Sequence, residues 1–247
     1  MKILICIGSV PDTTSKIKFI ENDTVFNKTD IQYIVGPHEE LALTRLLDLR
    51  DAGNDLKITT VTVGNKESEN TIRKALAMGA DDAIRVDAEP IDAYFVANQI
   101  AEVLKKGSYD LIVTGKESID YNGGQVAGMI AEILDLPSVN SASFFDIQGD
   151  KMIIERESDL GKEVIEGVKP MVISAGKGFA IEPRIPNMRG IMLARKKELQ
   201  VVQISNNDFF TDSQKYYLPQ PKGKCKFIAT ENAEDLVRLL HEEAKII

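Results

Sequence analysis

The sequence predicts an α/β fold: a parallel sheet with helices on both faces, an antiparallel extension and a C-terminal arm. Short apolar runs at residues 2–7, 58–63 and 111–114 are typical of strands that are buried on both faces. Segments with helical spacing of apolar residues separate these runs, and glycines stand where the elements end. Strands that alternate with helices of this length form right-handed βαβ units, which build a parallel sheet.

The first half of the chain alternates regularly between strands and helices. Gly36 and Pro37 open the first helix, and Gly53 ends it. The second helix closes at Gly79, which fits the C′ position. The predicted strands are 2–7, 58–63, 83–86 and 111–114, and the predicted helices begin at Pro37, near Ile72, at Ala93 and near Gln125.

The pattern changes after Pro137. Segments 143–148, 151–156 and 163–168 indicate short strands separated by turn signals, and segment 170–174 returns to a buried strand. We expect the three short strands to extend the parallel sheet in antiparallel fashion.

The end of the chain is predicted to form an extended arm. From about Asn206 the sequence loses periodicity, and only a final helix at about 231–245 follows, with an acidic first turn that suits the helix dipole. We therefore divide the chain into a nucleotide-binding α/β domain, residues 1–205, and an arm with its helix, residues 206–247. An arm that docks on a partner subunit and an arm that folds back on its own domain both fit this pattern.

Composition excludes several classes of function. The chain has 30 basic and 38 acidic side chains, a net charge of −8, and lacks the basic surface of a nucleic-acid-binding protein. No apolar run approaches the ~20 residues that a membrane span needs. Two cysteines and two histidines are too few for a structural zinc site, so we expect no metal. We expect a soluble cytoplasmic protein with reduced thiols.

The candidate ligand site lies in the loops after the strands, because open parallel sheets bind ligands beyond the carboxyl ends of their strands. These loops are residues 8–13, 36–39, 63–65 and 115–126. In the last loop, glycines precede an apolar helix whose free backbone N–H groups suit a phosphate. The loop matches neither the dinucleotide fingerprint nor the P-loop, so a phosphate site and an ordinary tight turn both remain open.

No group of residues indicates catalysis. His38 follows Gly36 and Pro37 at a helix start, where a surface or capping role is an equal alternative to a role in the site. His241 lies among glutamates and reads as solvated. The residues alone therefore indicate a Rossmann-like adenine-nucleotide binder that is not an enzyme by itself.

Three motifs in register carry a resemblance to a known family. Residues 71–81, residues 115–120, and residues 182–184 with 189–192 look like the small (beta) subunit of electron-transfer flavoprotein, and the match in order and spacing covers about residues 1–200. The resemblance implies an electron-carrier subunit that pairs with a larger alpha subunit, which holds the redox-active FAD. It also implies one structural AMP in this chain and no catalytic residues.

The resemblance also implies which residues line the nucleotide pocket. The phosphate would rest on the backbone of residues 123–126, in agreement with the argument from the helix start. The implied lining residues are Cys6, Gly36, Pro37, His38, Glu39, Val63, Gly115, Asp120, Tyr121, Asn122, Gly123, Gly124, Gln125 and Val126.

Segment 176–198 resembles the loop by which the family recognises its dehydrogenases. Met188 stands where the family usually has leucine; it reads as an apolar anchor for a partner pocket, with a core residue as the alternative. Residues 195–197 match a basic cluster that would steer acidic partners. The implied docking residues are Pro183, Arg184, Met188, Arg189, Ile191, Arg195, Lys196 and Lys197. The implied partners are acyl-CoA dehydrogenases in fatty acid oxidation and a membrane quinone oxidoreductase.

Some residues depart from the housekeeping pattern and leave two alternatives open. Gly36, His38 and Val126 stand where the family often has asparagine, an aromatic residue and threonine. Val126 and residues 10–13 are shared with electron-bifurcating members, which hold a second FAD in place of AMP and oxidise NADH. We expect AMP, because residues 155–157 and 182–184 look like the housekeeping branch. A nucleotide-binding regulatory domain without a redox role is the second alternative.

Overall fold

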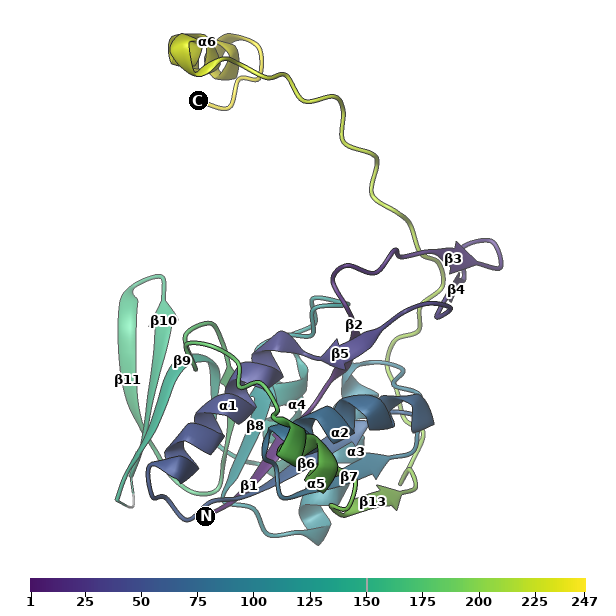
Figure 1. The fold of residues 1–247 in the computed structure, drawn as a ribbon, viewed down its shortest axis with the longest axis vertical. Coiled ribbons are helices and arrows are strands. Elements are labelled where there is room, and N and C mark those ends of the chain that lie inside the picture. The colour runs from purple at the N-terminus through teal and green to yellow at the C-terminus, as the bar shows by residue number, and fades with distance from the viewer. Residues whose placement is uncertain (150) are drawn as a thin grey trace.

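The centre of the molecule is a nine-stranded sheet, shown in the computed structural model of Figure 1, which describes residues 1–149 and 151–247. In spatial order its strands are β11 (Gly161–Gly167), β10 (Lys151–Ser158), β9 (Ser138–Gln148), β12 (Met171–Ala175), β8 (Leu111–Gly115), β1 (Lys2–Cys6), β6 (Lys57–Val63), β7 (Asp82–Val86) and β13 (Leu199–Val202).

Most of this sheet is parallel. Every pairing from β9 across to β13 is parallel, whereas β10 runs antiparallel to both β9 and β11. The predicted parallel sheet with an antiparallel extension is thereby confirmed. One detail differs, because β9 begins at Ser138 rather than at residue 143 and pairs in parallel with β12 before it turns into the antiparallel hairpin.

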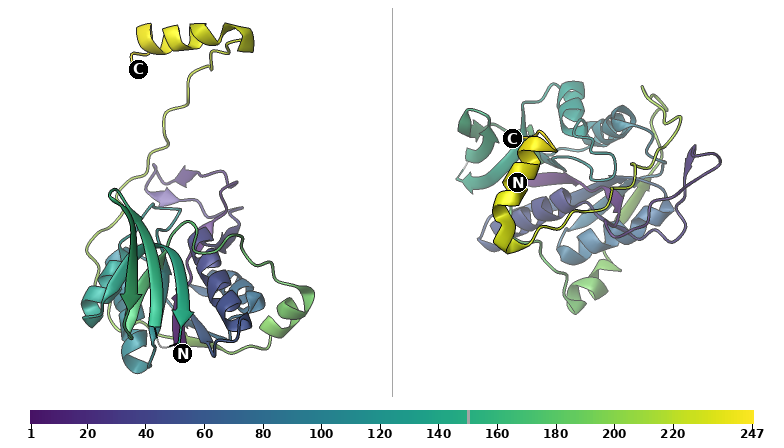
Figure 2. Two further views of the ribbon diagram at one scale, coloured as in Figure 1. Left: turned by 90° about the vertical axis from the view of Figure 1, so that its left-hand side faces the viewer. Right: turned by 90° about the horizontal axis from the view of Figure 1, so that it is seen from above.

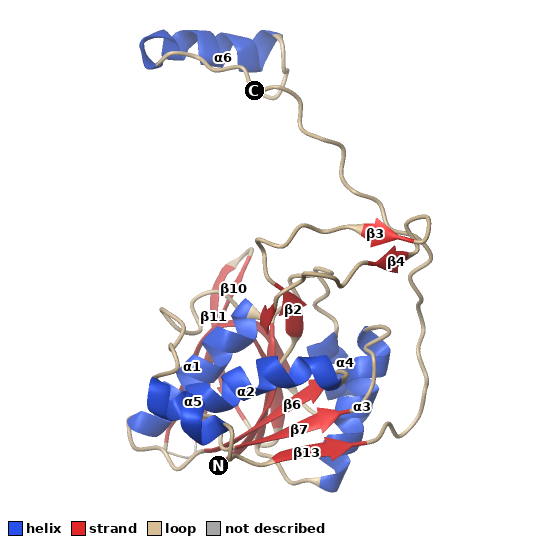
Figure 3. Cartoon of the chain, turned by 45° about the vertical axis from the view of Figure 1, so that its right-hand side comes forward, coloured by secondary structure: helices blue, strands red, loops and turns tan. Residues whose placement is uncertain are grey.

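Helices cover both faces of the sheet (Figure 3). One face carries α1 (Pro37–Asp51), α2 (Glu69–Met78) and α5 (Met188–Ala194), and the other carries α3 (Ala93–Lys106) and α4 (Val126–Leu134). Along β1, Ile3 and Ile5 belong to the first core and Leu4 and Cys6 to the second, because successive strand residues point to opposite faces. Both faces need apolar cover, and this is why β1 reads as one continuous apolar run.

Local chemistry sets the helix ends. α1 begins with Pro37, as predicted. α2 ends at Gly79, whose φ of +144° is easily adopted only by glycine. α3 is capped by Asp92, whose side chain accepts a hydrogen bond of 2.7 Å from the backbone N–H of Phe95. No helix among the described residues combines the length and apolar character that a bilayer crossing requires.

The elements that sequence patterns did not predict are short. They are β2 (Ser9–Pro11), β3 (Phe19–Ile20), β4 (Val25–Phe26), β5 (Tyr33–Val35), the 3-10 helix η1 (Lys66–Ser68), α5 and β13. β2 pairs with β5, and β3 pairs with β4, so that residues 9–35 make two small hairpin-like sheets. In Figure 1 these lie beyond the end of the central strands where the candidate site is expected.

The arm begins along its own domain and then leaves it. Its first part is held by aromatic stacking of Phe210 on Tyr94, with ring centroids 3.9 Å apart, and of Tyr216 on Phe19, at 4.8 Å. Residues 203–229 contain no helix or strand, and η2 (Thr230–Asn232) and α6 (Ala233–Glu242) follow. Figure 2 shows α6 standing well apart from the sheet and its helices.

Candidate functional site

Three of the candidate segments meet where the central strands end. Cys6 is the last residue of β1, Val63 of β6 and Gly115 of β8, and β1 lies between the other two strands. The chain passes from β1 to β6 on one side and returns later to β8 on the other side. This arrangement is the topological switch point at which open α/β sheets bind their ligands.

Three glycines surround the carboxyl group of Glu39 at this point. A Cβ added to Gly8, Gly36 or Gly115 would lie 3.1 Å from Oε1, 2.2 Å from Oε2 or 2.7 Å from Cδ of Glu39, respectively. Glu39 is 8 % exposed, and its Oε2 has no hydrogen-bond partner among the described residues. The glycines therefore leave room for a buried carboxyl group whose second oxygen can serve a polar ligand.

Burial changes the acidity of two groups in the site. Desolvation raises the pKa of the Glu39 carboxyl from 4.5 to about 7, and the charge of Asp120 adds to this effect. The pKa of the Cys6 thiol is also raised, first by burial and then by the charge of Glu39, so Cys6 remains a neutral thiol. A carboxyl group that is partly protonated near neutral pH can accept or donate a hydrogen bond, which suits recognition of a polar ligand.

His38 joins the start of α1 to the loop after β8. Its Nε2 lies 3.7 Å from Oε1 of Glu117, and its Nδ1 is buried without a partner in the described part of the chain. The side chain is only 19 % exposed. His38 thus faces the loop that contains the candidate phosphate site.

The loop from Lys116 to Gln125 is shaped by its own hydrogen bonds. The backbone N–H of Ser118 donates to the carbonyl of Gly123 over 2.9 Å, and Asn122 adopts a φ of +56°. α4 follows with no side-chain cap from Gln125 and no acidic residue in its first turn. The first N–H groups of α4 therefore lack a side-chain acceptor, and their dipole favours an anion. This helix start fits a phosphate group.

Segment 176–198, the candidate docking segment, contains the short helix α5, which exposes apolar side chains. Met188 is 74 % exposed and Met192 66 %, and Ile191 and Leu193 are also exposed. The Asn187 side chain caps the helix by accepting a hydrogen bond of 2.8 Å from the backbone N–H of Gly190. Met188 is therefore available to a partner, whereas a core residue would be buried.

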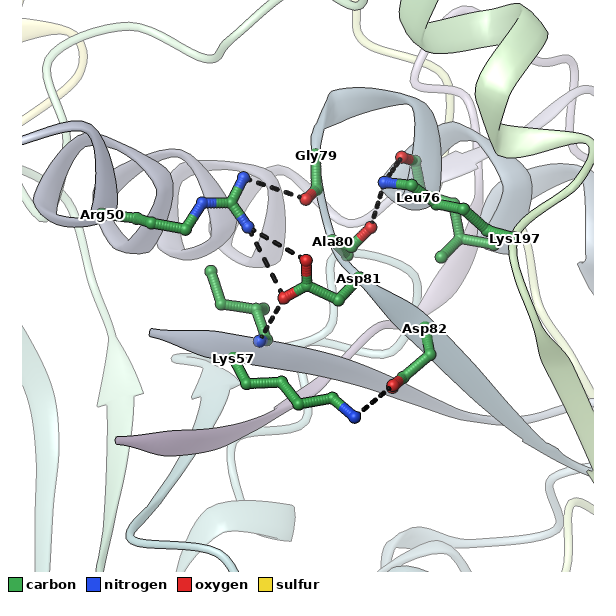
Figure 4. A network of polar contacts seen from close by, with 9 residues as sticks. Arg50, Lys57, Leu76, Gly79, Ala80, Asp81, Asp82 and Lys197 are labelled. Carbon is green, nitrogen blue, oxygen red and sulfur yellow. Dashed lines mark hydrogen bonds and ion pairs between the residues drawn. The ribbon is translucent and has the colours of Figure 1, made fainter. Parts of the chain in front are cut away.

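The basic residues of the candidate docking segment lie in different surroundings. Arg184 pairs with Asp48 at 2.6 Å and with Asp51 at 2.9 Å, both in α1. Lys197 is half-buried, and its ammonium group donates to the carbonyls of Leu76, over 3.0 Å, and of Ala80 (Figure 4). Arg189, Arg195 and Lys196 are exposed.

Comparison with known proteins shows the family of this chain. Residues 23–207 match the family described as "Electron transfer flavoprotein domain". The chain belongs to the electron-transfer flavoprotein family. It is 32 % identical to an electron transfer flavoprotein subunit beta of Bacillus subtilis (strain 168), over the full length of both chains. The corresponding human subunit is 30 % identical over 100 % of this chain and 99 % of its own. That of Megasphaera elsdenii is 33 % identical over 81 % of this chain and 77 % of its own.

The residues that the flavoprotein resemblance assigned to the pocket differ in burial. Cys6, Gly36 and Glu39 are buried, Pro37, His38, Val63, Gly115 and Val126 are partly buried, and Asp120, Tyr121, Asn122, Gly123, Gly124 and Gln125 are exposed. The exposed set forms the loop in front of α4. Their role in binding a nucleotide stays a prediction.

Sequence patterns placed the loops of this flavoprotein site, but they missed Tyr216 and the contact partners of the loop residues. Glu117 faces His38, and Tyr216 of the arm lies against Tyr121, whose pKa is raised by burial and by a hydrogen bond with Tyr216. Gly8 belongs to loop 8–13, which the sequence predicted as part of the ligand site. No local signal identifies Tyr216, because it lies far along the chain from the loop that it meets.

The polar groups of the site can bind a polar ligand. No group of three or more histidine, cysteine, aspartate or glutamate side chains is placed to hold a metal ion in residues 1–149 and 151–247. The buried Glu39 carboxyl, the His38 imidazole and the open start of α4 together offer hydrogen bonds to a base or ribose and to a phosphate. This set fits a ligand that carries a phosphate group and further hydrogen-bonding groups.

Proposed function

We propose that this chain is the small subunit of a heterodimeric electron carrier. The complex accepts electrons from acyl-CoA and related dehydrogenases and passes them to a membrane quinone oxidoreductase. The observation that carries the proposal is the full-length similarity to beta subunits of electron transfer flavoproteins. FAD, held mainly by the alpha subunit, would take up and release the electrons, and this chain would form one wall of its site.

The nucleotide of this chain is AMP, held as a structural ligand. The uncapped start of α4 supports a phosphate at residues 123–126. The buried Glu39 oxygen without a partner and the Nδ1 of His38 support polar contacts to the nucleoside part. Burying a nucleotide between α1, α4 and the ends of β1 and β8 would satisfy these groups and stabilise the folded chain.

The alpha subunit is the proposed partner of the arm. α6 stands apart from the domain in Figure 1 and exposes Leu236 and Val237, and Phe227 before it is 93 % exposed. A short helix with an uncovered apolar face gains stability only by packing on another surface. The larger subunit would supply that surface.

The exposed face of α5 is the proposed site for dehydrogenases. Met188 and Met192 give this face flexible apolar side chains, which adapt to a partner pocket. The neighbouring Arg195 and Lys196 are exposed and would attract an acidic partner over a longer range.

One observation favours the electron-bifurcating alternative. Val126 is the first residue of α4 and carries no hydroxyl group that could hydrogen-bond to a phosphate. In that alternative, the pocket holds a second FAD, and the complex is an enzyme that oxidises NADH.

The test is to purify the complex from its own cells and count the released nucleotides by chromatography. We expect one AMP and one FAD for each pair of subunits. Two FAD and no AMP would replace the carrier with the bifurcating enzyme. A chain that purifies without a large subunit and without flavin would overturn the proposal in favour of a regulatory domain.

A further inference from the structure

Two cationic side chains join helices α2 and α5: one extends from α2 to the end of α5, and the other extends from the segment after α5 to the end of α2. Lys197 follows α5, and its ammonium group donates to the carbonyls of Leu76 and Ala80 at the C-terminal end of α2. Arg73 lies within α2, and its Nη1 donates to the carbonyls of Ala194 and Lys197 at the C-terminal end of α5, over 2.8 Å each. Each helix thus has its free carbonyls satisfied by a cation that comes from the other one.

The two helices also approach closely. A Cβ at Gly190 would lie 2.5 Å from the carbonyl oxygen of Ala77, so the backbone of α5 lies directly against the last turn of α2. Ala194, at 2 % exposure, is the buried residue of α5. α5 therefore has little apolar burial of its own, and a helix of seven residues is unstable in isolation.

The end of α2 is in turn fixed to the sheet (Figure 4). Arg50 of α1 donates to the carbonyl of Gly79 over 3.1 Å and pairs with Asp81 at 3.3 Å. Asp81 accepts a hydrogen bond of 2.8 Å from the backbone N–H of Ile58 in β6. The carbonyls that Lys197 binds therefore belong to a part of the chain that is anchored on two sides.

Lys197 differs from the two basic residues before it, because its charged group is bound to α2. Burial lowers the pKa of its ammonium group, against a smaller opposing influence of Asp81. Arg195 and Lys196 are exposed, and within the described residues their side chains form no ion pair or hydrogen bond. A charge already bound to two carbonyls is poorly placed to attract a distant partner, whereas these two neighbours are free to do so.

We infer that Arg73 and Lys197 are positioning residues for the docking of partner dehydrogenases. They hold α5 in a fixed place, so that the exposed side chains of Met188 and Met192 meet the partner without first being ordered. Binding to a preformed surface avoids the entropy cost of ordering it. The inference rests on the docking role proposed above for α5, and it assigns to Lys197 a different task from that of Lys196.

The test compares Lys197→Met with Lys196→Met in the complete heterodimer with its FAD. Both changes remove one positive charge at adjacent positions, and only the first removes the contacts to α2. We call the contacts of Arg73 with the end of α5 and of Lys197 with the end of α2 the clamp. Hydrogen–deuterium exchange of the α5 amides measures directly whether the clamp holds α5. The dependence of flavin reduction on heterodimer concentration, with a reduced acyl-CoA dehydrogenase as electron donor, separates KM from kcat.

For Lys197→Met we expect faster exchange in α5 and a KM raised by about tenfold, with kcat nearly unchanged. Lys197→Arg should restore most of the slow exchange in α5 and most of the low KM, because a guanidinium can also bind two carbonyls. Lys196→Met should leave the exchange unchanged and raise KM modestly at low salt only, because salt screens the attraction that Lys196 provides. Arg73→Met, which acts on the other end of the clamp, should repeat the Lys197→Met result.

Three outcomes decide the matter, with equal FAD content and circular dichroism as the check on folding. Unchanged exchange in both Lys197→Met and Arg73→Met would overturn the clamp. Faster exchange with an unchanged KM would overturn the positioning role, because docking would then not need an ordered α5. If the unaltered heterodimer is not reduced by any dehydrogenase, the docking function itself fails, and the exchange data alone decide whether the clamp exists.

Discussion

Arg73 donates a hydrogen bond to the backbone carbonyl of Lys197, while the ammonium group of Lys197 donates to the carbonyl of Leu76, one turn further along the helix that contains Arg73. The two residues are 124 positions apart in the sequence. This exchange of contacts fixes a small exposed helix onto the edge of a large α/β domain. It gives the candidate docking surface a definite shape, although that surface has almost no core of its own.

The buried carboxyl of Glu39 makes stability depend on pH. Its pKa in the folded chain, about 7, lies above the ordinary value of 4.5, so between these values the folded state binds more protons than the unfolded state. The free energy of unfolding should therefore fall as pH rises from 5 to 8, by at most ~3 kcal/mol. Glu39→Gln should be flatter over this range. Urea denaturation at pH 5 and pH 8 measures the free energy of unfolding of both proteins. An equal change with pH in the unaltered protein and in Glu39→Gln would contradict the raised pKa of Glu39.

The glycine at the end of β8 should not tolerate a side chain. In Gly115→Ala the new Cβ would lie 2.7 Å from Cδ of Glu39, so this buried carboxyl group would have to shift from its place. We expect a loss of about 1–3 kcal/mol in the free energy of unfolding. Gly123→Ala is the matched control, since a Cβ there has nothing within 4 Å. Equal stability of the two variants would show that the space around Glu39 is not tightly filled.

The longer strands and helices were predictable because their apolar residues follow a regular pattern in the sequence. β1, β6 and β8 are buried on both faces, and their sequences are therefore apolar runs. Gly79 is a recognisable signal for the end of α2. α5 was not predictable in this way, because only Ala194 is buried and no apolar stripe forms. β2 to β5 have two or three residues each, which is too short for any period to appear.

The candidate site was predictable in part for a similar reason. The carboxyl ends of parallel strands meet at one edge, so the loops after β1, β6 and β8 could be placed together before the structure was known. The surroundings of individual residues could not. Three basic residues in a row look alike in the sequence, yet Lys197 is bound to α2 whereas Arg195 and Lys196 are exposed. That difference arises from contacts across more than one hundred residues.

Met188 should contribute directly to docking. Met188→Ala removes the most exposed apolar side chain of α5, so electron transfer from the partner dehydrogenase should become several-fold slower at low concentration, while FAD content stays the same. Leu160→Ala is a suitable control, because Leu160 is fully exposed and lies in the turn between β10 and β11. Equal rates for the two variants would remove the anchor role from Met188.

The end of the arm should matter for assembly and little for the fold of the domain. Removing residues 219–247 keeps Tyr216 on Phe19 and Phe210 on Tyr94, so the shortened chain should melt at nearly the same temperature. Its association with the alpha subunit should weaken, because the apolar face of α6 is lost. Size-exclusion chromatography of the mixed subunits measures this. A shortened chain that forms a full complement of heterodimer would rule out the proposed task of α6.

The most direct test of the whole account is an anaerobic titration of the purified heterodimer, followed through the absorbance of its flavin. We predict that an acyl-CoA substrate with a catalytic amount of its dehydrogenase bleaches the flavin, and that NADH alone does not. Bleaching by NADH alone would contradict the account and identify the bifurcating enzyme instead.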